Sequence, residues 1–354
     1  MIAENLKSAD FPGVFESLAD LGSHLESLVA GHSKLFVLTD ENTLSCCWPK
    51  MAAACPLLNE AHMLEIDPGD DNKCLEIAGQ LWSCLLETKA DRNALIINLG
   101  GGVITDLGGF VASAYKRGIA YINIPTTLMA QTDAAIGGKT GINHDRIKNV
   151  VGTFHPPKTT LICPVFLETL EYEELLSGLA EMLKHGLIAD KTLWNDLVNI
   201  NPKELINRAD LIGRSIAVKT YITTEDPHEK GIRKLLNAGH TIGHAIESQA
   251  VAKGKPLSHG RAVAMGMAFE STLALAKGLL TQDENSEIQT VLNSFFGPPD
   301  LSELTTEDLM QFVLNDKKNQ HDKFLFALPT GIGTAAFDVE IKEDEIATCL
   351  LSLK

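Results

Sequence analysis

The sequence lacks the marks of a membrane-bound, secreted or nucleic-acid-binding protein. No stretch reaches the roughly 18 consecutive apolar residues that a membrane span needs, because Asp, Lys or Gly interrupts the longest runs. The opening MIAENLKSADFPG has neither a basic segment nor an apolar core, so we expect no secretory signal and a cytoplasmic location. A formal net charge of −16 argues against nucleic acid as a partner, since such binding needs clustered Lys and Arg.

The cysteines are odd in number and scattered. Seven cysteines without a C-x-x-C spacing argue against a disulfide framework and against a thiolate zinc site. The remaining composition is that of an ordinary globular protein, and a length of 354 residues favours two domains. Because the overall field is negative, any anionic ligand has to be held by a few cations gathered in one place.

The first half of the chain alternates strand and helix patterns. Short runs that are apolar on both faces occur at 34–40, 94–102 and 120–128, and a helical pattern lies at 72–90. This alternation predicts a Rossmann-like parallel sheet. Ligands of such sheets bind beyond the carboxyl ends of the strands.

The second half is helical in pattern. Apolar residues recur at helical spacing in 175–190, 240–252 and 261–280, and strand-like runs nearly vanish after about residue 165. We therefore predict an α/β nucleotide-binding domain at 1–165 and an all-α domain at 166–354.

The segment GGKTGINHDRIKN at 137–149 contains a GKT trio like the end of a phosphate-binding P-loop. In the pattern G-x-x-x-x-G-K-[ST], however, the place of the first glycine is taken by Asp133. A carboxylate there would repel a phosphate, so the segment is not predicted to bind ATP or GTP.

Three glycines follow a predicted strand in NLGGGVITDLGGF at 98–110. Backbone N–H groups in such a turn can approach a pyrophosphate closely, as dinucleotide sites require. The spacing is not G-x-G-x-x-G, so a tight strand-to-helix turn without a ligand is an equal alternative. Asp40, at another strand end, could hold a ribose hydroxyl or cap a helix.

The segment NAGHTIGHAIE at 237–247 places His240 and His244 four residues apart, on one face if it is helical. Such imidazoles can share a divalent metal, and His259 and Glu181 offer further ligands. The glutamate of H-E-x-x-H is missing, which argues against a zinc protease. Each histidine alone is more simply structural, but together with an isolated Glu among apolar neighbours they predict a metal site.

Several cations lie in glycine-rich turns or on helices beside apolar residues. Singly, each would be a solvated surface charge, but together they could bind a small molecule with more than one anionic group. They are Arg117, Lys139, Lys184, Lys219 and Arg233, with Asn149 and Asn237 near them.

Six blocks of the sequence, in order, resemble the 3-dehydroquinate synthase family. They are GGGVITDLGGFVASAYKRG, IPTTLMAQTDAAIGGKTGIN, KNVVGTFHPP, GLAEMLKHGLI, GIRKLLNAGHTIGHAIE and SHGRAVAMGM, and the match spans roughly residues 35 to 335. The resemblance implies a homodimeric enzyme with an NAD-binding α/β half and a helical half. It also implies one divalent metal, zinc or cobalt, in the cleft between the halves.

Enzymes of this family convert 3-deoxy-D-arabino-heptulosonate 7-phosphate to 3-dehydroquinate and phosphate, in the shikimate pathway to aromatic amino acids. The resemblance implies that NAD transiently oxidises the C5 hydroxyl, which acidifies the C6 hydrogen and permits elimination of phosphate. Re-reduction, ring opening and an internal aldol reaction then close the carbocycle, while the metal stabilises the C4 and C5 oxygens.

Carried over by position, the resemblance assigns metal and substrate contacts. The metal ligands are Glu181, His240 and His259, which moves His244 from the metal to the phosphate side. The implied phosphate cradle is Lys139, Asn149, His244 and either Lys317 or Lys318, with Arg117 reaching it from the partner subunit. The implied contacts to the rest of the substrate are Lys219, Arg233 and Asn237 at its carboxylate and nearby oxygens, and Asp133 and Lys184 at its hydroxyls.

The positions that match the cofactor site lie in the first half. On the adenosine-ribose side they are Asp40 and Asn42, with Asp70 and Lys73 as less regular counterparts. Along the rest of the dinucleotide they are Gly101, Gly102 and Val103 at the pyrophosphate, Asp106 at the nicotinamide, and Thr126 and Thr127 at the ribose and phosphate. Further cofactor contacts are assigned to Lys139, Lys148, Phe166, Thr169 and Leu170.

The sequence departs from the family pattern in three places. EMLKHG stands where the helix block usually reads EVIKYG, so His185 replaces a tyrosine. The uncharged ICP of LICPVFLETL replaces an aspartate commonly found before the domain junction, and DDNK replaces the usual adenosine-side acid and lysine. None of these departures touches a metal or phosphate position.

Three alternatives stay open at this point. A related sugar-phosphate cyclase of the aminocyclitol or valiolone type needs no carboxylate grip, so Lys219, Arg233 and Asn237 favour a carboxylated substrate. A metal-dependent polyol dehydrogenase would accumulate NADH and would leave Lys139 and Asn149 without a phosphate to bind. A non-catalytic binding protein would not need the complete ligand set.

Overall fold

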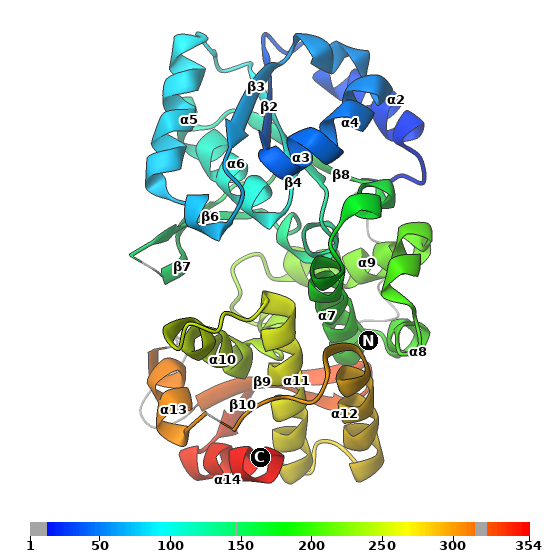
Figure 1. Cartoon of the computed structure of the whole chain (residues 1–354), viewed down its shortest axis with the longest axis vertical. Helices are drawn as coiled ribbons and strands as arrows, with labels where there is room; N and C mark the ends of the chain where they lie inside the picture. Colours follow the sequence, from blue (N-terminus) through cyan, green and yellow to red (C-terminus); the bar gives the residue numbers. More distant parts are fainter. Residues whose placement is uncertain (1–12, 146, 303, 316–323) are drawn as a thin grey trace. The chain divides into compact units, whose positions relative to one another are not determined.

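The computed structural model describes residues 13–145, 147–302, 304–315 and 324–354 (Figure 1). It forms two compact units. One, the sheet unit, contains the described residues up to Glu171 together with Lys203–Ile216, and the other, the helical unit, contains Tyr172–Pro202 and Ala217–Lys354. Each unit is described by itself.

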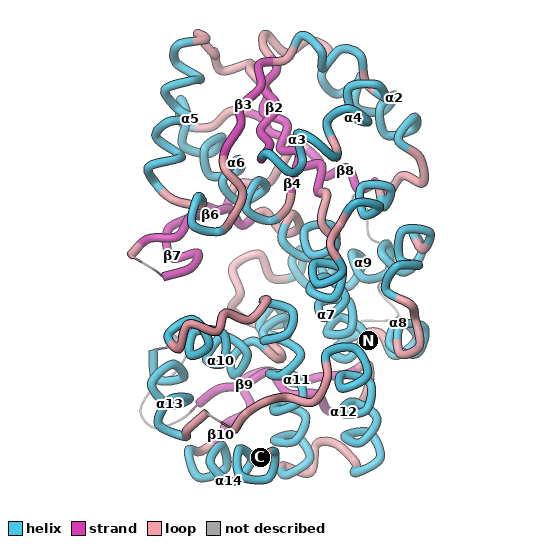
Figure 2. Tube along the Cα trace, in the orientation of Figure 1, coloured by secondary structure: helices cyan, strands magenta, loops and turns pink. Residues whose placement is uncertain are grey.

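The sheet unit contains one parallel sheet and a separate hairpin (Figure 2). The strands of the sheet are β1 (Gly13–Val14), β2 (Leu35–Asp40), β3 (His62–Ile66), β4 (Leu95–Gly100), β5 (Ala120–Pro125) and β8 (Thr159–Ile162). The hairpin strands are β6 (Lys139–His144) and β7 (Ile147–Phe154). The helices are α2 (Leu18–Val29), α3 (Glu41–Cys46), α4 (Trp48–Ala54), α5 (Leu75–Glu87) and α6 (Gly102–Ala114). The predicted Rossmann-like sheet is confirmed.

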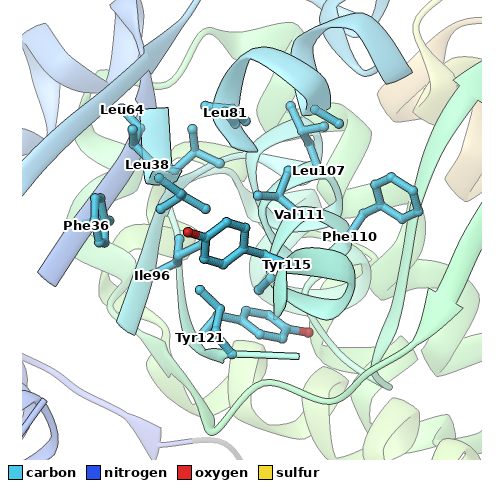
Figure 3. Close-up of a cluster of buried hydrophobic side chains, with 14 of the residues drawn as sticks. Phe36, Leu38, Leu64, Leu81, Ile96, Leu107, Phe110, Val111, Tyr115 and Tyr121 are labelled. Carbon is cyan, nitrogen blue, oxygen red and sulfur yellow. The ribbon is translucent and has the colours of Figure 1, made fainter. Parts of the chain in front are cut away.

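Helices cover both faces of this sheet. On one face, Phe36, Ile96 and Tyr121 pack against α5 and α6 (Figure 3). On the other face, Val37 and Ile97 pack against α2 and α4. Successive side chains of a strand point to opposite faces, so a strand covered on both sides is apolar throughout. This is why β4 is buried along its whole length and shows no alternating pattern in the sequence.

The strand order is β1-β8-β5-β4-β2-β3, and all neighbouring strands run parallel. Strand β3 lies on one side of β2, and the chain then crosses to the other side of β2, where β4 and β5 follow in order. In open α/β sheets the ligand crevice lies at such a switch point, beyond the carboxyl ends of the strands. Asp40 ends β2 and Gly100 ends β4, so these two residues mark that position.

The GKT segment forms the antiparallel hairpin β6–β7, in which Lys139 is opposite Phe154 and His144 is opposite Ile147. A P-loop would continue directly into a helix. The structure therefore agrees with the exclusion of an ATP or GTP loop here.

The helical unit is built around α11 (His259–Ala276), which is buried on most of its surface. This helix packs against α7, α10, α12, α14 and strand β9. The elements of the unit are α7 (Tyr172–Ala189), α8 (Lys191–Leu197), α10 (His240–Ala252), α12 (Gln282–Phe296), α13 (Thr306–Asn315), α14 (Glu343–Leu353), β9 (Phe324–Gly331) and β10 (Thr334–Ile341). Helix α9 (Ala209–Glu225) begins in the sheet unit and ends in the helical unit. Among the described residues, no helix has both the length and the apolar content to cross a membrane.

The helical prediction for the second half is confirmed, and its three predicted stretches coincide with α7, α10 and α11. The antiparallel hairpin β9–β10 is an addition that the sequence analysis did not locate. Pro329 and Gly331 interrupt its apolar pattern, and the register shifts along the pair.

Glycines let α10 and α11 approach closely. A Cβ added to Gly266 would lie 1.9 Å from the carbonyl oxygen of Gly239, and one added to Gly243 would lie 2.8 Å from the carbonyl oxygen of Ala262. Both distances are well below van der Waals contact, so a side chain does not fit at either position. The crossing holds the starts of the two helices, with His240 and His259, next to each other.

Candidate metal centre and nucleotide-binding edge

Three histidines of the helical unit lie together, and two of them lie beside one buried carboxylate. The ring centroids of His240 and His244 are 5.1 Å apart, those of His240 and His259 are 5.5 Å apart, and those of His244 and His259 are 5.7 Å apart. Glu181 Oε1 lies 3.4 Å from His240 Nε2 and 3.6 Å from His259 Nε2. One ring nitrogen from each histidine lies within 4.8 Å of the others, which is close enough to share one ion.

Glu181, on α7, is fully buried, and neither of its oxygens makes a hydrogen bond of good geometry, although Lys184 Nζ lies beside Oε2. A buried carboxylate without hydrogen bonds is costly unless cations offset it. Burial alone would raise the pKa of Glu181, but Lys184 and His240 outweigh burial and hold that pKa well below its ordinary value. The group is therefore an anion, as a metal ligand must be. His185, the departure next to Lys184, is also fully buried.

The three histidines titrate differently. Burial lowers the pKa of His240, and burial together with the neighbouring His240 lowers the pKa of His244 to about 3. Burial also opposes protonation of His259, but the neighbouring carboxylates of Glu181 and Glu247 outweigh burial and raise its pKa to about 9. Without a metal, His259 therefore carries a proton at neutral pH, and a metal ion has to displace that proton.

This donor set fits a divalent metal. Two imidazoles and one carboxylate are the protein ligands of many catalytic zinc sites, which keep a further position open for water or substrate. The residues that would hold the ion are Glu181, His240 and His259. His244 is near enough to be a fourth ligand, and its assignment to the phosphate side stays a prediction.

Two carboxylates that the sequence analysis did not identify support this centre. Glu247 Oε2 lies 3.4 Å from His259 Nδ1, an arrangement that fixes the ring of a metal-binding histidine. Glu270 is buried and accepts two backbone N–H groups at the start of α10, the closer from Gly239 at 2.5 Å, and so holds the turn that carries His240. Glu247 follows His240 by seven residues, on the same helical face, and that spacing could have revealed it. Glu270 has no comparable signal in the sequence.

The cations predicted to hold a carboxylate are buried in the helical unit. Lys219 lies on α9, and Arg233 and Asn237 lie in the short helix η7 (Ile232–Asn237). Apolar residues of α9 and η7 pack in one cluster. The side chain of Asn237 donates to Glu229 Oε1 at 2.8 Å. Cations on elements that pack together suit an anionic ligand, because the negative overall field requires cations gathered in one place to hold an anion.

The glycine turn after β4 starts a helix without a capping side chain. Helix α6 begins at Gly102, and its N-cap Gly101 makes no side-chain hydrogen bond. The N–H groups of the first turn are therefore open to an anion such as a pyrophosphate. Thr126 and Thr127 follow the neighbouring strand β5 at the same edge, where Thr126 N donates to Gly100 O at 3.0 Å. The buried hydroxyl of Thr126 makes no hydrogen bond with the protein.

Asp40 caps helix α3. Its Oδ1 accepts from Thr43 N at 2.8 Å and from Thr43 Oγ1 at 2.9 Å. Both bonds use the same oxygen, so capping and ribose binding by Oδ2 are compatible. The other predicted positions of the sheet unit are Asn42 on α3, Val103 on α6, Arg117 in η3 (Tyr115–Arg117), Asp133 in η4 (Ala130–Ala134), Phe166 and Thr169 in η5 (Pro164–Thr169), and Leu170 after it.

Lys73 joins three predicted site segments. Its buried Nζ lies 2.5 Å from Asp106 Oδ2 and 2.5 Å from Asn149 Oδ1. Lys148 Nζ lies 3.5 Å from Asp70 Oδ2 at the same end of the hairpin. The structure thus places Lys73, which the resemblance assigned to the cofactor, against Asn149, which it assigned to the substrate phosphate.

Lys139 and Asn149 lie toward opposite ends of the hairpin. Lys139 pairs with Phe154 at the open end, whereas Asn149 lies near the closed end with a φ of 53°. Their shared role in a phosphate cradle stays a prediction. Lys317 and Lys318 lie outside the described residues.

Comparison with known proteins gives a consistent result. The model of the N-terminal part of 3-dehydroquinate synthase matches residues 63–177, and the model of the C-terminal part matches residues 178–319. A 3-dehydroquinate synthase from Parabacteroides distasonis is 40% identical over 336 residues, 94% of this chain and 95% of the relative. One from Pyrococcus furiosus is 39% identical over 342 residues, 96% and 98% of the two chains.

Among solved structures, 2-epi-5-epi-valiolone synthase from Streptomyces hygroscopicus subsp. jinggangensis, with NAD+ and Zn2+ bound, superimposes with a TM-score of 0.85. The two sequences are 30% identical, and the superposition covers 98% of this chain and 97% of the synthase chain. The chain therefore has the fold of this sugar-phosphate cyclase. Among proteins of this fold, the chain belongs to the 3-dehydroquinate synthase family.

Proposed function

We propose that this chain converts 3-deoxy-D-arabino-heptulosonate 7-phosphate to 3-dehydroquinate and inorganic phosphate. It would act as a phosphate-eliminating carbon–oxygen lyase that depends on NAD and on zinc or cobalt. The observation that carries the proposal is the buried carboxylate of Glu181 beside two histidines, in a chain whose two halves match this family in order.

When bound, NAD supplies reversible oxidation of the substrate C5 hydroxyl, and the metal supplies Lewis acidity at neighbouring oxygens. The protein supplies position and charge. Glu181, His240 and His259 are the proposed metal ligands, and Glu247 keeps the ring of His259 oriented.

In the sheet unit, the free N–H groups at the start of α6 are proposed to hold the pyrophosphate of NAD. Lys73 donates to the amide oxygen of Asn149, so the amide N–H groups of that side chain point away from Lys73. Those donors are proposed to bind the substrate phosphate, and the charge of Lys73 also offsets that of Asp106.

The remaining substrate contacts are proposed from the family resemblance. Lys219, Arg233 and Asn237 would hold the carboxylate, which separates this substrate from uncarboxylated sugar phosphates. Further contacts are proposed for Lys139, His244 and one of Lys317 and Lys318 at the phosphate, for Asp133 and Lys184 at the hydroxyls, and for Arg117 from a partner subunit in a homodimer.

A phosphate-release assay tests the function. We expect phosphate from the heptulosonate phosphate, no net NADH, loss of turnover with a chelator, and recovery with Zn2+. Phosphate from sedoheptulose 7-phosphate but not from the heptulosonate phosphate would instead indicate a valiolone-type cyclase. Net NADH from a simple polyol without phosphate release would indicate a dehydrogenase.

A further inference from the structure

Asp226 lies directly after α9 and organises the chain that leads into η7. Its Oδ1 accepts from Lys230 N at 3.0 Å, and its Oδ2 accepts from Gly231 N at 2.6 Å and from Arg233 N at 3.2 Å. Hydrogen bonds to an ionised acceptor are about twice as strong as those between neutral groups. The charge of this one carboxylate therefore closes residues 226–233 into a loop, which we call the 226–233 loop.

The side chain of Arg233 is fastened to the same loop. Its Nη1 donates back to the carbonyl oxygen of Pro227 at 2.9 Å. The guanidinium group is planar and rigid, so a bond to one of its nitrogens restricts the orientation of the whole fork. Because Arg233 is buried, the loop is part of the surroundings that hold this cation in place.

The 226–233 loop also contacts Asn237, which is predicted to bind the substrate carboxylate together with Arg233. Asn237 Nδ2 donates to Glu229 Oε1 at 2.8 Å. Glu229 has a φ of 57°, a left-handed conformation that is unfavourable for a residue other than glycine. Such conformations persist only where the surrounding structure enforces them, and they concentrate at ligand sites. The bonds from Asp226 to the next two N–H groups, those of Lys230 and Gly231, enforce this one.

We propose that Asp226 is a positioning residue for the carboxylate of the substrate. By closing the 226–233 loop, it fixes the side chains of Arg233 and Asn237 before the substrate binds. Groups that are already ordered bind a ligand more tightly, because the cost of ordering them is not incurred on binding. This inference rests on the proposed function, in which Arg233 and Asn237 hold that carboxylate.

Steady-state kinetics of phosphate release test the role of Asp226. Asp226→Asn keeps the size of the side chain, but it removes the charge and replaces one accepting oxygen with an NH2 group. The substrate carboxylate does not react, so its contacts stabilise the bound substrate and the transition state equally. With Zn2+ and NAD saturating, we expect KM for the heptulosonate phosphate to rise at least tenfold and kcat to stay within threefold of the wild type.

Two binding measurements separate this role from a general loss of structure. Calorimetry with 3-dehydroquinate, which carries the same carboxylate, should show a matching loss of affinity in Asp226→Asn. The affinity for NAD should stay within twofold of the wild type, because the predicted NAD contacts lie in the sheet unit. Circular dichroism checks that the variant folds.

The matched control is Asp190→Asn. Asp190 Oδ1 accepts from Thr192 N at 3.0 Å and from Leu193 N at 2.9 Å at the start of α8. The same substitution therefore removes the same kind of bond from the same unit. We expect the melting temperature to fall in both variants, but KM should stay within twofold of the wild type in Asp190→Asn.

The result that would overturn the inference is a folded Asp226→Asn with the KM of the wild type, or with a loss of kcat at unchanged KM. A rise in KM that is equally large in Asp190→Asn would also overturn it. Asp226→Ser, whose hydroxyl can still accept one N–H group, is the second variant if Asp226→Asn does not fold, and the same KM threshold applies to it. A wild type that releases no phosphate from the heptulosonate phosphate would refute the proposed function and this inference together.

Discussion

Gly266→Ala is the most direct test of how the metal centre is built. The added Cβ would lie 1.9 Å from the carbonyl oxygen of Gly239 and 2.7 Å from the backbone nitrogen of Gly243. Both neighbours are backbone atoms, so α10 and α11 have to move apart by more than 1 Å to reach ordinary contact. Overpacking of this kind costs about 1–3 kcal/mol in the free energy of unfolding. We expect the melting temperature to fall by about 3–10 °C.

Metal affinity should fall as well, because His240 lies on α10 and His259 lies on α11. We expect about a tenfold loss of Zn2+ affinity, measured by competition with a chromogenic chelator, by analogy with changes to groups that orient metal ligands. Gly79→Ala is the matched control, since a Cβ on Gly79 in α5 meets nothing within 4 Å. Alanine raises helix propensity, so this control should be neutral or slightly stabilising. The reasoning is refuted if Gly266→Ala melts within 1 °C of the wild type and binds Zn2+ equally well.

Three further predictions concern the site. Glu247→Gln should weaken Zn2+ binding by about tenfold, because Glu247 orients the His259 ring. Unchanged affinity in the chelator competition would argue against this role. The pKa of His259 is raised to about 9, so below that pH a metal ion has to displace a proton, and Zn2+ affinity should rise up to about tenfold per pH unit between pH 7 and 9 and level off above. Calorimetry in buffers of different ionisation enthalpy should detect the released proton. An affinity that does not change with pH would contradict this prediction. Lys139→Ala should lower kcat/KM for phosphate release by about a hundredfold, because a cation at the leaving phosphate is lost; a change below threefold would remove Lys139 from the cradle.

Much of the fold follows from patterns that are local in the sequence. The continuous apolar run of β4 indicates that the strand is covered on both faces. This inference can be made without knowing which helices cover the strand. Helical spacing likewise located α10 and placed His240 and His244 on it. The Asp at position 133 was enough to reject a P-loop, because a single misplaced charge is incompatible with a phosphate nest.

Other features depended on contacts between distant residues. Lys73 meets Asp106 and Asn149 across 33 and 76 residues of sequence, and no local pattern specifies that meeting. Glu270 holds the start of α10 from the next helix along the chain. Residues Lys203–Ile216 belong to the sheet unit, although the segments on either side of them belong to the helical unit. The hydrophobic pattern of the sequence did not predict this assignment.

The sequence by itself determined the type of each main element, the glycine turn, the histidine pair and the family to which the motifs point. Those properties depend on neighbours within a few turns or one strand, so periodicity and residue type suffice to identify them. Only the tertiary structure decided that β4 lies beside β2, that Glu181 meets His240 and His259 without a hydrogen bond, and that two glycine-containing helices cross closely enough to hold them. These are outcomes of packing, in which the shapes of segments far apart in the chain determine which side chains come within a few ångströms of one another.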